Sequence, residues 1–342
     1  MNYICINMFT PLPIRPARSG WTFFFIPMSD LNYDKPPLTY SEQISRLQSR
    51  GLIIESHEKA CHILKNISYY RMSGYWHPFL SEPKSSHQFK DGSTFNHAFK
   101  IYCFDREIRS LILNEIEKIE IGIRAQLIYQ LSHNKGAFWY TESKNFKNNY
   151  KFEKSIEKLK NEYTKSDEEF IQSFKSKYSN PMPPSWMMLE ISSFGNLSNL
   201  YSNLNPGLTK RQIASHFGLD DSTFASWIHA LVYIRNVCAH HSRLWNRLYG
   251  IRAQIPNNPR NPFLNSTYYT DENGKKQYFN KKTYFVLSMI IYLLNSVNPK
   301  HTFQQKLNRL FNKYPMIDLK AMGFPDSWKT EALWDWDKRI SD

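Results

Sequence analysis

The sequence has few cysteines and no long apolar run. Its four cysteines stand far apart, at Cys5, Cys61, Cys103 and Cys238. This spacing argues against a disulfide framework or a zinc ribbon and fits a reducing cytoplasm. No apolar stretch approaches the roughly 20 residues that a membrane-spanning helix needs. We find no internal repeat, Walker loop or dinucleotide fingerprint. We therefore expect a cytoplasmic protein with no membrane partner and no cofactor.

Negative charge is scarce relative to positive charge. The chain has 30 Asp and Glu against 44 Lys and Arg, a net charge of +14, and its isoelectric point is near 9.4. Such a balance points to a polyanionic partner, although it also fits a membrane surface. Aromatic residues make up 15% of the 342 residues and could fill a core or stack on bases. A chain of this length can bury a substantial core, as one large domain or two closely packed ones.

Residues 1–33 do not share the pattern of the rest. Arg15 and Arg18 precede the apolar stretch Trp21–Met28, as in a signal peptide. The stretch is too short, however, Pro27 interrupts it, and no small-residue cleavage site follows. We expect a poorly ordered tail, or a natural start at Met28, with a docked aromatic arm as the alternative. Residues 34–342 are then expected to form a single all-α domain.

Apolar periodicity predicts helices over most of the chain. Thr39 and Glu42 form a capping-box signature, and the best helix runs from Asn96 to Leu131. Charged side chains of both signs lie opposite its apolar stripe, which is typical of a solvated face. Asp105 and Glu115 fall within or beside the stripe, where a carboxylate needs a partner. The stripe consists of Phe104, Ile108, Leu111, Ile112, Ile116, Ile119, Ile123, Leu127 and Leu131.

Four later stretches complete the expected architecture. Residues 141–180 are rich in Lys with interleaved Glu and predict two exposed amphipathic helices, with a solvated face favoured over an RNA-binding one. Trp186–Phe194 is predicted as an apolar helix. Asn273–Gly274 between aromatic flanks predicts one small β-hairpin. Tyr284–Leu294 is apolar nearly all round and predicts the most buried helix.

The chain is organised around the stretch from Trp227 to Arg247, which can be read as one helical wheel. One stripe is typical of a buried helix face, and Asp220 or Asp221 is a plausible N-cap. The opposite stripe, with Arg235 on its flank, suits an anion better than a solvated Lys and Glu face would. The buried stripe holds Trp227, Leu231, Ile234, Cys238, His241 and Trp245, and the opposite one holds His229, Tyr233, Asn236, His240, Arg243 and Arg247.

The polar stripe carries a recognisable motif. Arg235, Asn236 and His240 are similar to the active-site motif of HEPN ribonucleases, an Arg and a polar residue followed by a His after four to six positions. The spacing alone is weak, since Arg71 to His77 and Arg211 to His216 fit it as well.

The longer string around this motif is more specific. Residues 233–247 resemble the Abi-like phage abortive-infection family, of the AbiD and AbiF type. Further strings also resemble the family, so the resemblance extends from about residue 33 to the C-terminus. They are Tyr33–Tyr40, residues 67–76, Met322–Pro325 and Trp334. The resemblance implies a HEPN-type helical bundle with added helices.

The resemblance implies metal-independent RNA cleavage by attack of the ribose 2′-hydroxyl. His240 can serve as acid or base, and Arg235 can hold phosphate with two donors. Asn236 can orient the imidazole or a phosphate oxygen. On an ideal helix Arg235 and His240 point about 140° apart. Either the helix bends or ends near Ala239, or a second copy completes the site, and HEPN enzymes commonly pair two motifs in a dimer.

RNA-binding residues are expected around this motif. We assign Arg243, Arg247, Tyr233 and His229 to RNA binding, with Arg71 from the aromatic stretch 67–76. For that stretch, packing of the N-terminal helices is the favoured alternative. Arg109 and Arg124 could also meet the anionic site, but their positions along their helix do not decide it.

Two alternatives concern the neighbouring side chains. His241 also satisfies the spacing, but the wheel places it on the buried stripe, so we favour His240. A metal site from His229, Cys238, His240 and His241 is disfavoured because Cys238 and His240 point in nearly opposite directions. The resemblance also implies no metal.

Two classes of function remain. The first is a ribonuclease toxin of abortive infection that acts on an RNA substrate as a homodimer, with an antitoxin RNA or protein as a further partner. The second is a non-catalytic HEPN-like module that binds RNA and is held by an RNA or protein partner. The intact Arg235, Asn236 and His240 favour cleavage, because a pure binder needs no titrating group there.

Overall fold

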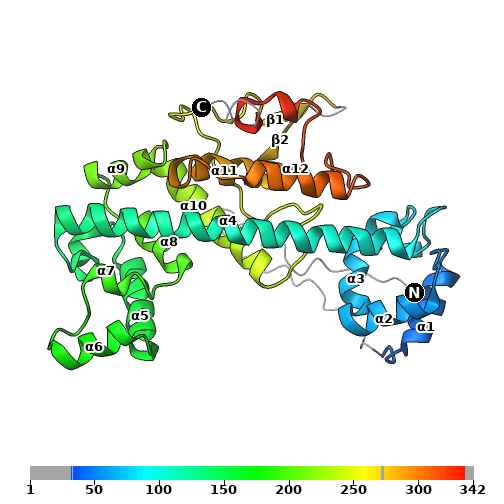
Figure 1. Cartoon of the computed structure of the whole chain (residues 1–342), viewed down its shortest axis with the longest axis horizontal. Helices are drawn as coiled ribbons and strands as arrows, with labels where there is room; N and C mark the ends of the chain where they lie inside the picture. The colour runs from blue at the N-terminus through cyan, green and yellow to red at the C-terminus, as the bar shows by residue number, and fades with distance from the viewer. Residues whose placement is uncertain (1–31, 33, 271–272, 336–342) are drawn as a thin grey trace, which may run out of the picture. The chain divides into compact units, whose positions relative to one another are not determined.

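The computed structural model describes Asn32, residues 34–270 and residues 273–335 (Figure 1). Helices dominate this part of the chain, which confirms the predicted all-α class. The chain forms two compact units, of which the first ends at Phe104 and the second begins at Asp105. Apart from Asn32, the expected N-terminal tail lies outside the described residues. This division does not decide whether residues 34–342 form the expected single domain, which stays a prediction.

The first unit consists of three short helices and the start of a long one. Thr39 and Glu42 cap each other reciprocally, which confirms the capping box, and Gly51 follows the first helix with φ +89°. In the aromatic stretch, Tyr75 and Trp76 are buried whereas Tyr70 is 86% exposed. Part of this stretch thus packs inside the first unit, and its favoured role, to wedge the N-terminal helices onto the bundle, stays a prediction. The elements are α1 (Tyr40–Ser49), α2 (His57–Ile67), α3 (Tyr69–Trp76), the 3-10 helices η1 (His77–Phe79) and η2 (Lys84–Ser86), and the first residues of α4 (Phe95–Lys135).

The second unit contains the rest of α4 and the helices that follow. Its most buried helix is α11, in which every residue from Thr283 to Leu294 is buried, as predicted. The elements are α5 (Asn149–Lys165), α6 (Glu169–Lys177), α7 (Ser185–Met188), α8 (Phe194–Asn203), α9 (Leu208–His216), α10 (Asp221–Ala239), α11 (Thr283–Val297), α12 (Phe303–Lys313), and the 3-10 helices η3 (Trp139–Thr141), η4 (Ser143–Asn145), η5 (Phe279–Lys281), η6 (Trp328–Thr330) and η7 (Ala332–Trp334).

Helix α4 has the predicted apolar stripe, which is buried throughout except for the half-buried Leu111. The two carboxylates on or beside the stripe both have partners. Glu115 accepts from the ammonium groups of Lys118 at 2.7 Å and Lys306 at 3.1 Å. Asp105 pairs with Arg109 and accepts backbone N–H groups. Each charge is thus compensated where it is buried.

Two further predictions from local pattern are confirmed. Strand β1 (Tyr268–Thr270) pairs antiparallel with β2 (Lys276–Tyr278), and Gly274 in the connection has φ +73°. In the Lys-rich region, α5 and α6 bury apolar residues and leave Lys151, Lys154, Lys158, Lys160 and Lys165 exposed. Within the described residues, no helix combines the length and the apolar character needed to cross a bilayer.

Candidate active site at the end of helix α10

Helix α10 presents one buried and one polar face, as the wheel predicted. It begins after Asp220, whose carboxylate accepts the Thr223 N–H at 2.8 Å. This confirms Asp220 as the N-cap. The buried face packs against α8, α9 and α11, with the Trp227 ring 5.5 Å from that of Tyr292. Trp227, Leu231, Ile234 and Cys238 are buried, whereas His229, Arg235 and Asn236 are exposed and Tyr233 is half-buried.

The helix ends earlier than the wheel assumed. It stops at Ala239, and the residues from His240 to Arg247 are not helical. His241 has φ +55°, in the left-handed region. The Ser242 N–H donates to the Val237 carbonyl at 2.9 Å and the His241 N–H to the Cys238 carbonyl at 3.1 Å. These two bonds form a Schellman motif, in which the left-handed position is usually glycine. The prediction of one helix through Arg247 was wrong, whereas an end near Ala239 is confirmed.

The early end also changes the position of His241. The wheel placed it on the buried stripe, but the structure leaves it exposed, next to the exposed His240. The physical reason is the reversal of the backbone at φ +55°, after which the 100° step no longer applies. Trp245 is nevertheless buried, at 4% exposure, through the path of the loop. Burial therefore does not separate His240 from His241.

Arg235 and Asn236 interact with each other on the exposed side of the last turns. The Arg235 guanidinium donates to the Asn236 side-chain oxygen at 3.4 Å. The Asn236 backbone carbonyl accepts the His240 N–H at 2.9 Å. Asn236 is thus bonded to both other motif residues at the end of α10, to Arg235 through its side chain and to His240 through its backbone carbonyl.

Helix α4 brings a carboxylate to this motif that the sequence reasoning did not select. Glu120 lies close enough to Arg235 for their charges to interact. Burial raises the pKa of Glu120 above its ordinary value, and the opposing positive charges of Arg124 and Arg235 do not cancel this effect. The signal available in the sequence was the spacing of Glu120 and Arg124, four residues apart on the polar face of α4.

Arg124 is buried and holds a break between two helices. Its guanidinium donates to Glu120 at 2.8 Å and to the backbone carbonyls of Leu189 at 2.8 Å and Ser192 at 3.2 Å. The predicted helix Trp186–Phe194 is therefore wrong: α7 ends at Met188 and α8 begins at Phe194. Between α7 and α8, the backbone carbonyls of Leu189 and Ser192 accept hydrogen bonds from Arg124 and not from N–H groups of a continuing helix. Of the two arginines on α4 that could meet an anion, Arg124 is committed to this break, and Arg109 is buried against Asp105.

Comparison with known proteins identifies the family. The model of the Abi-like protein family matches residues 62–246, more than half of the chain. The chain belongs to the Abi-like family. The Abi-like match includes α4, α10 and the turn after α10, and it ends before the hairpin, α11 and α12. Neither the curated proteins nor the solved structures gave a match. Membership of the Abi-like family points to a role in phage abortive infection.

The residues assigned to RNA binding in this Abi-like protein fall into two groups. Near the motif, the guanidinium carbon of Arg247 lies 5.9 Å from the centroid of the Tyr233 ring, and Arg247 donates to the Arg243 carbonyl at 3.3 Å. His229 is exposed two turns before the motif. Arg71 is exposed on α3 of the first unit, and its assignment to RNA binding stays a prediction.

Cys238 does not have the character of a metal ligand. Burial raises the pKa of its thiol to about 12, with the negative charge of Asp105 acting in the same direction. A cysteine that binds a metal is a thiolate, whereas the buried Cys238 thiol stays protonated. Across the described ranges, no three His, Cys, Asp or Glu side chains form a cluster that could hold a metal ion.

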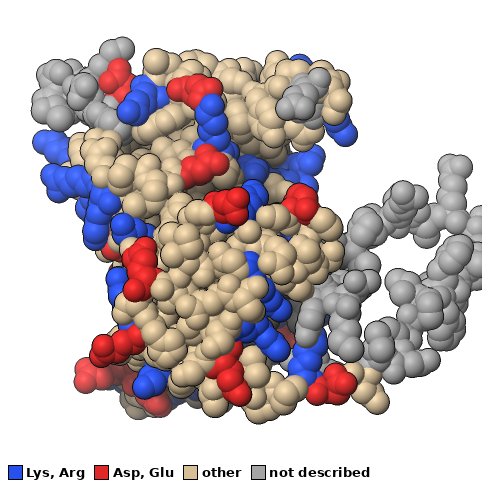
Figure 2. Space-filling view, turned by 90° about the vertical axis from the view of Figure 1, so that its right-hand side faces the viewer, with Lys and Arg blue, Asp and Glu red and all other residues tan. Residues whose placement is uncertain are grey.

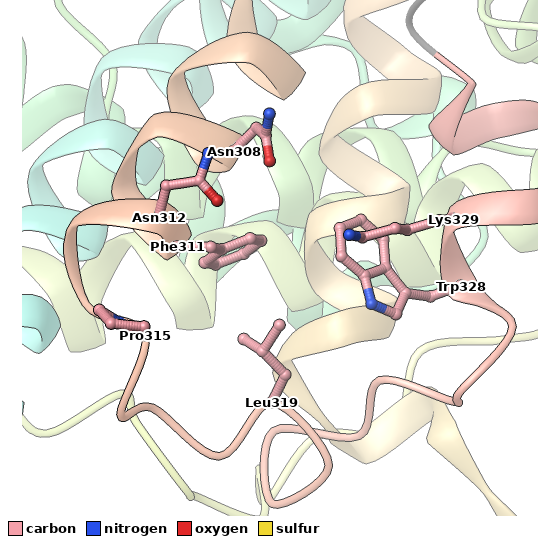
Figure 3. Close-up of a pocket in the computed structure, with 7 residues that line it drawn as sticks. All are labelled: Asn308, Phe311, Asn312, Pro315, Leu319, Trp328 and Lys329. Atoms are coloured by element: carbon pink, nitrogen blue, oxygen red, sulfur yellow. The ribbon is translucent and has the colours of Figure 1, made fainter.

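The charged surface and the cavity at the end of α12 add little to this site. Lys and Arg side chains are interspersed with Asp and Glu over the face in Figure 2, so the net positive charge does not form one patch there. A cavity of about 370 Å³ lies at the end of α12 (Figure 3) and contains none of the residues assigned to catalysis or RNA binding. It is lined by Asn308, Phe311, Asn312, Pro315, Leu319, Trp328 and Lys329.

Proposed function

We propose that this Abi-like protein is a metal-independent endoribonuclease of phage abortive infection, with Arg235, Asn236 and His240 as its catalytic residues. The observation that carries the proposal is the exposure of all three at the end of α10. Because the helix stops at Ala239, His240 is not held to the direction of an ideal helix, about 140° away from Arg235. The arrangement resembles the motif of HEPN ribonucleases, an Arg and a polar residue followed by a His.

Each residue has a role in RNA cleavage. His240 removes the proton of the ribose 2′-hydroxyl or protonates the leaving 5′-oxygen, because imidazole titrates near neutrality. Arg235 stabilises the negative charge that develops on the phosphate. Asn236 and Glu120 orient the Arg235 guanidinium, the first through its hydrogen bond and the second through its charge. The products are a 2′,3′-cyclic phosphate and a 5′-hydroxyl.

One chain carries one such motif, and we propose that two chains pair to form the active protein. His240 of one chain and that of its partner would then supply the acid and the base, which one imidazole cannot be in the same step. Arg243, Arg247, Tyr233 and His229 would line the path of the RNA. An antitoxin RNA or protein would hold the pair inactive.

The test is to incubate the purified protein with total RNA in EDTA and to map the new ends. We expect cleavage with cyclic phosphate ends, which is lost in His240→Ala and in Arg235→Ala. His216→Ala is the matched control, because His216 is exposed on α9 and also follows an arginine, Arg211, by five positions. That variant should cleave like the wild type.

His241→Ala decides between the two neighbouring histidines. Both side chains are exposed, so both alanine variants should fold, and the loss of activity alone identifies the catalytic one. Activity in His240→Ala and none in His241→Ala would move the assignment to His241. RNA binding without new ends in the wild type would instead support the non-catalytic RNA-binding module.

A further inference from the structure

A buried carboxylate holds the loop that follows the candidate catalytic residues. Asp105, on α4, has no exposed surface. One of its carboxylate oxygens accepts the Leu244 N–H at 3.1 Å and the Trp245 N–H at 2.6 Å. Arg109, one helical turn further along α4, pairs with the same carboxylate. Two consecutive backbone amides thus converge on one anion, in the manner of a nest.

The loop needs this anchor because it has no regular structure of its own. The residues between Ala239 and Tyr249 form no helix or strand, and both His241 and Asn246 have positive φ, at 55° and 47°. Buried N–H groups without partners are costly. For Leu244 and Trp245, that partner is the Asp105 carboxylate. The segment from His241 to Trp245 is thereby fixed at both ends. The Schellman motif holds its start and the Asp105 carboxylate holds Leu244 and Trp245.

We propose that Asp105 is a positioning residue for the reaction, an inference that rests on the proposed ribonuclease function. It cannot meet the RNA, because it is fully buried. It acts through the backbone of Leu244 and Trp245, which sets where His240 and His241 stand relative to Arg235. A displacement of about 1 Å at a catalytic group can cost roughly a hundredfold in rate.

Asp105→Asn removes the charge and one acceptor at nearly constant size, and Glu115→Gln is the matched control. Glu115 is a buried carboxylate on the same helix that pairs with Lys118 and Lys306 and has no hydrogen bond to the loop. Both variants leave cations without their carboxylate, so both should lower the melting temperature. Only the first should disturb the loop.

The readouts are single-turnover cleavage of a defined RNA and amide hydrogen exchange of the peptide covering residues 240–249. For Asp105→Asn we expect a maximal rate roughly a hundredfold lower, a half-saturating concentration within about twofold of wild type, and faster exchange in this peptide. The half-saturation should hold because Arg235, Arg243 and Arg247 keep their charge. Glu115→Gln should leave the rate, the half-saturation and the exchange of this peptide at wild-type values.

If Asp105→Asn does not fold, the double variant Asp105→Leu, Arg109→Leu replaces it, since no charge is then left buried and unpaired and no side-chain oxygen remains at position 105 to accept the two N–H groups. The same loss of rate is expected. Wild-type cleavage in a folded Asp105 variant, or an equal loss in Glu115→Gln, would overturn the inference while the ribonuclease function stands. If the wild type cleaves no RNA, that function fails, and the exchange measurement alone decides: unchanged exchange at residues 240–249 overturns the anchoring role.

Discussion

Substitution of His241 by glycine tests the left-handed turn at the end of α10. A residue with a side chain pays steric strain at φ +55°, whereas glycine does not. His240, its neighbour, is the matched position, because it is also an exposed histidine but has φ −85°. We compare alanine with glycine at each position, so that contacts of the imidazole rings cancel. Four variants are needed: His240→Ala, His240→Gly, His241→Ala and His241→Gly.

The expected magnitudes follow from two opposing effects. Glycine raises the entropy of the unfolded chain by the equivalent of about 0.4–1 kcal/mol at either position. At position 241 it also relieves a left-handed strain of roughly 1–2 kcal/mol. Going from alanine to glycine should therefore stabilise the protein by about 0.5–1 kcal/mol at 241 and destabilise it by a similar amount at 240. The entropy effect cancels between the positions and leaves a difference of about 1–2 kcal/mol.

Thermal unfolding of the four variants measures this difference. One kcal/mol corresponds to about 2–4 °C for a cooperative unit of about 150–250 residues. The glycine variant should melt above the alanine variant at 241 and below it at 240. The same sign at both positions would refute the left-handed turn. His241→Ala should melt close to wild type, because the side chain is exposed.

Three other outcomes are expected. RNA binding should weaken steeply between low and moderate salt because each neutralised phosphate releases counterions, and an affinity that does not change with salt would argue against a nucleic-acid partner. Sedimentation at micromolar concentration should give a dimer, and an active monomer would contradict the paired site. Asp220→Ala should lower the free energy of unfolding by about 1 kcal/mol through loss of the N-cap. Burial raises the pKa of Asp220, but the hydrogen bonds that its carboxylate accepts, above all from Thr223, together lower it more, so the folded pKa lies below its ordinary value. This stabilisation is complete above the unfolded pKa and is lost as the pH falls through the folded one, so denaturation curves of wild type and variant should converge in acid.

The parts of the fold that depend on local pattern could be read from the sequence. The apolar stripe of α4, the two faces of α10 and the Asp220 cap follow from the helical period and from the chemistry of helix ends. The end of α10 near Ala239 stood only as one of several alternatives because His241 occupies the left-handed position, where the sequence signal is glycine. A wheel continued past that point no longer gives the directions of the later side chains, as the exposed His241 shows.

The parts of the site that depend on two segments could not be read in this way. The need of Asp105 for a partner was visible, but the partners are backbone N–H groups about 140 residues away, and a backbone amide has no sequence signature. The approach of Glu120 to Arg235 depends on the rotation of α4 relative to α10. A single sequence shows which residues share a face of one helix, but not which faces of two helices meet.

Two carboxylates of α4 act on the site, so the length of helix between them matters as much as its composition. Asp105 holds the loop through hydrogen bonds, and the charge of Glu120 acts on Arg235 from fifteen positions later on one unbroken helix. Deleting a single residue between them would rotate one carboxylate by about 100° and shift it by about 1.5 Å relative to the other. A seven-residue change would keep the rotation within about 20° but would shift the two carboxylates by roughly 10 Å relative to each other. Evolution can therefore exchange many side chains on this stretch, but insertions and deletions should be confined to the loops outside it.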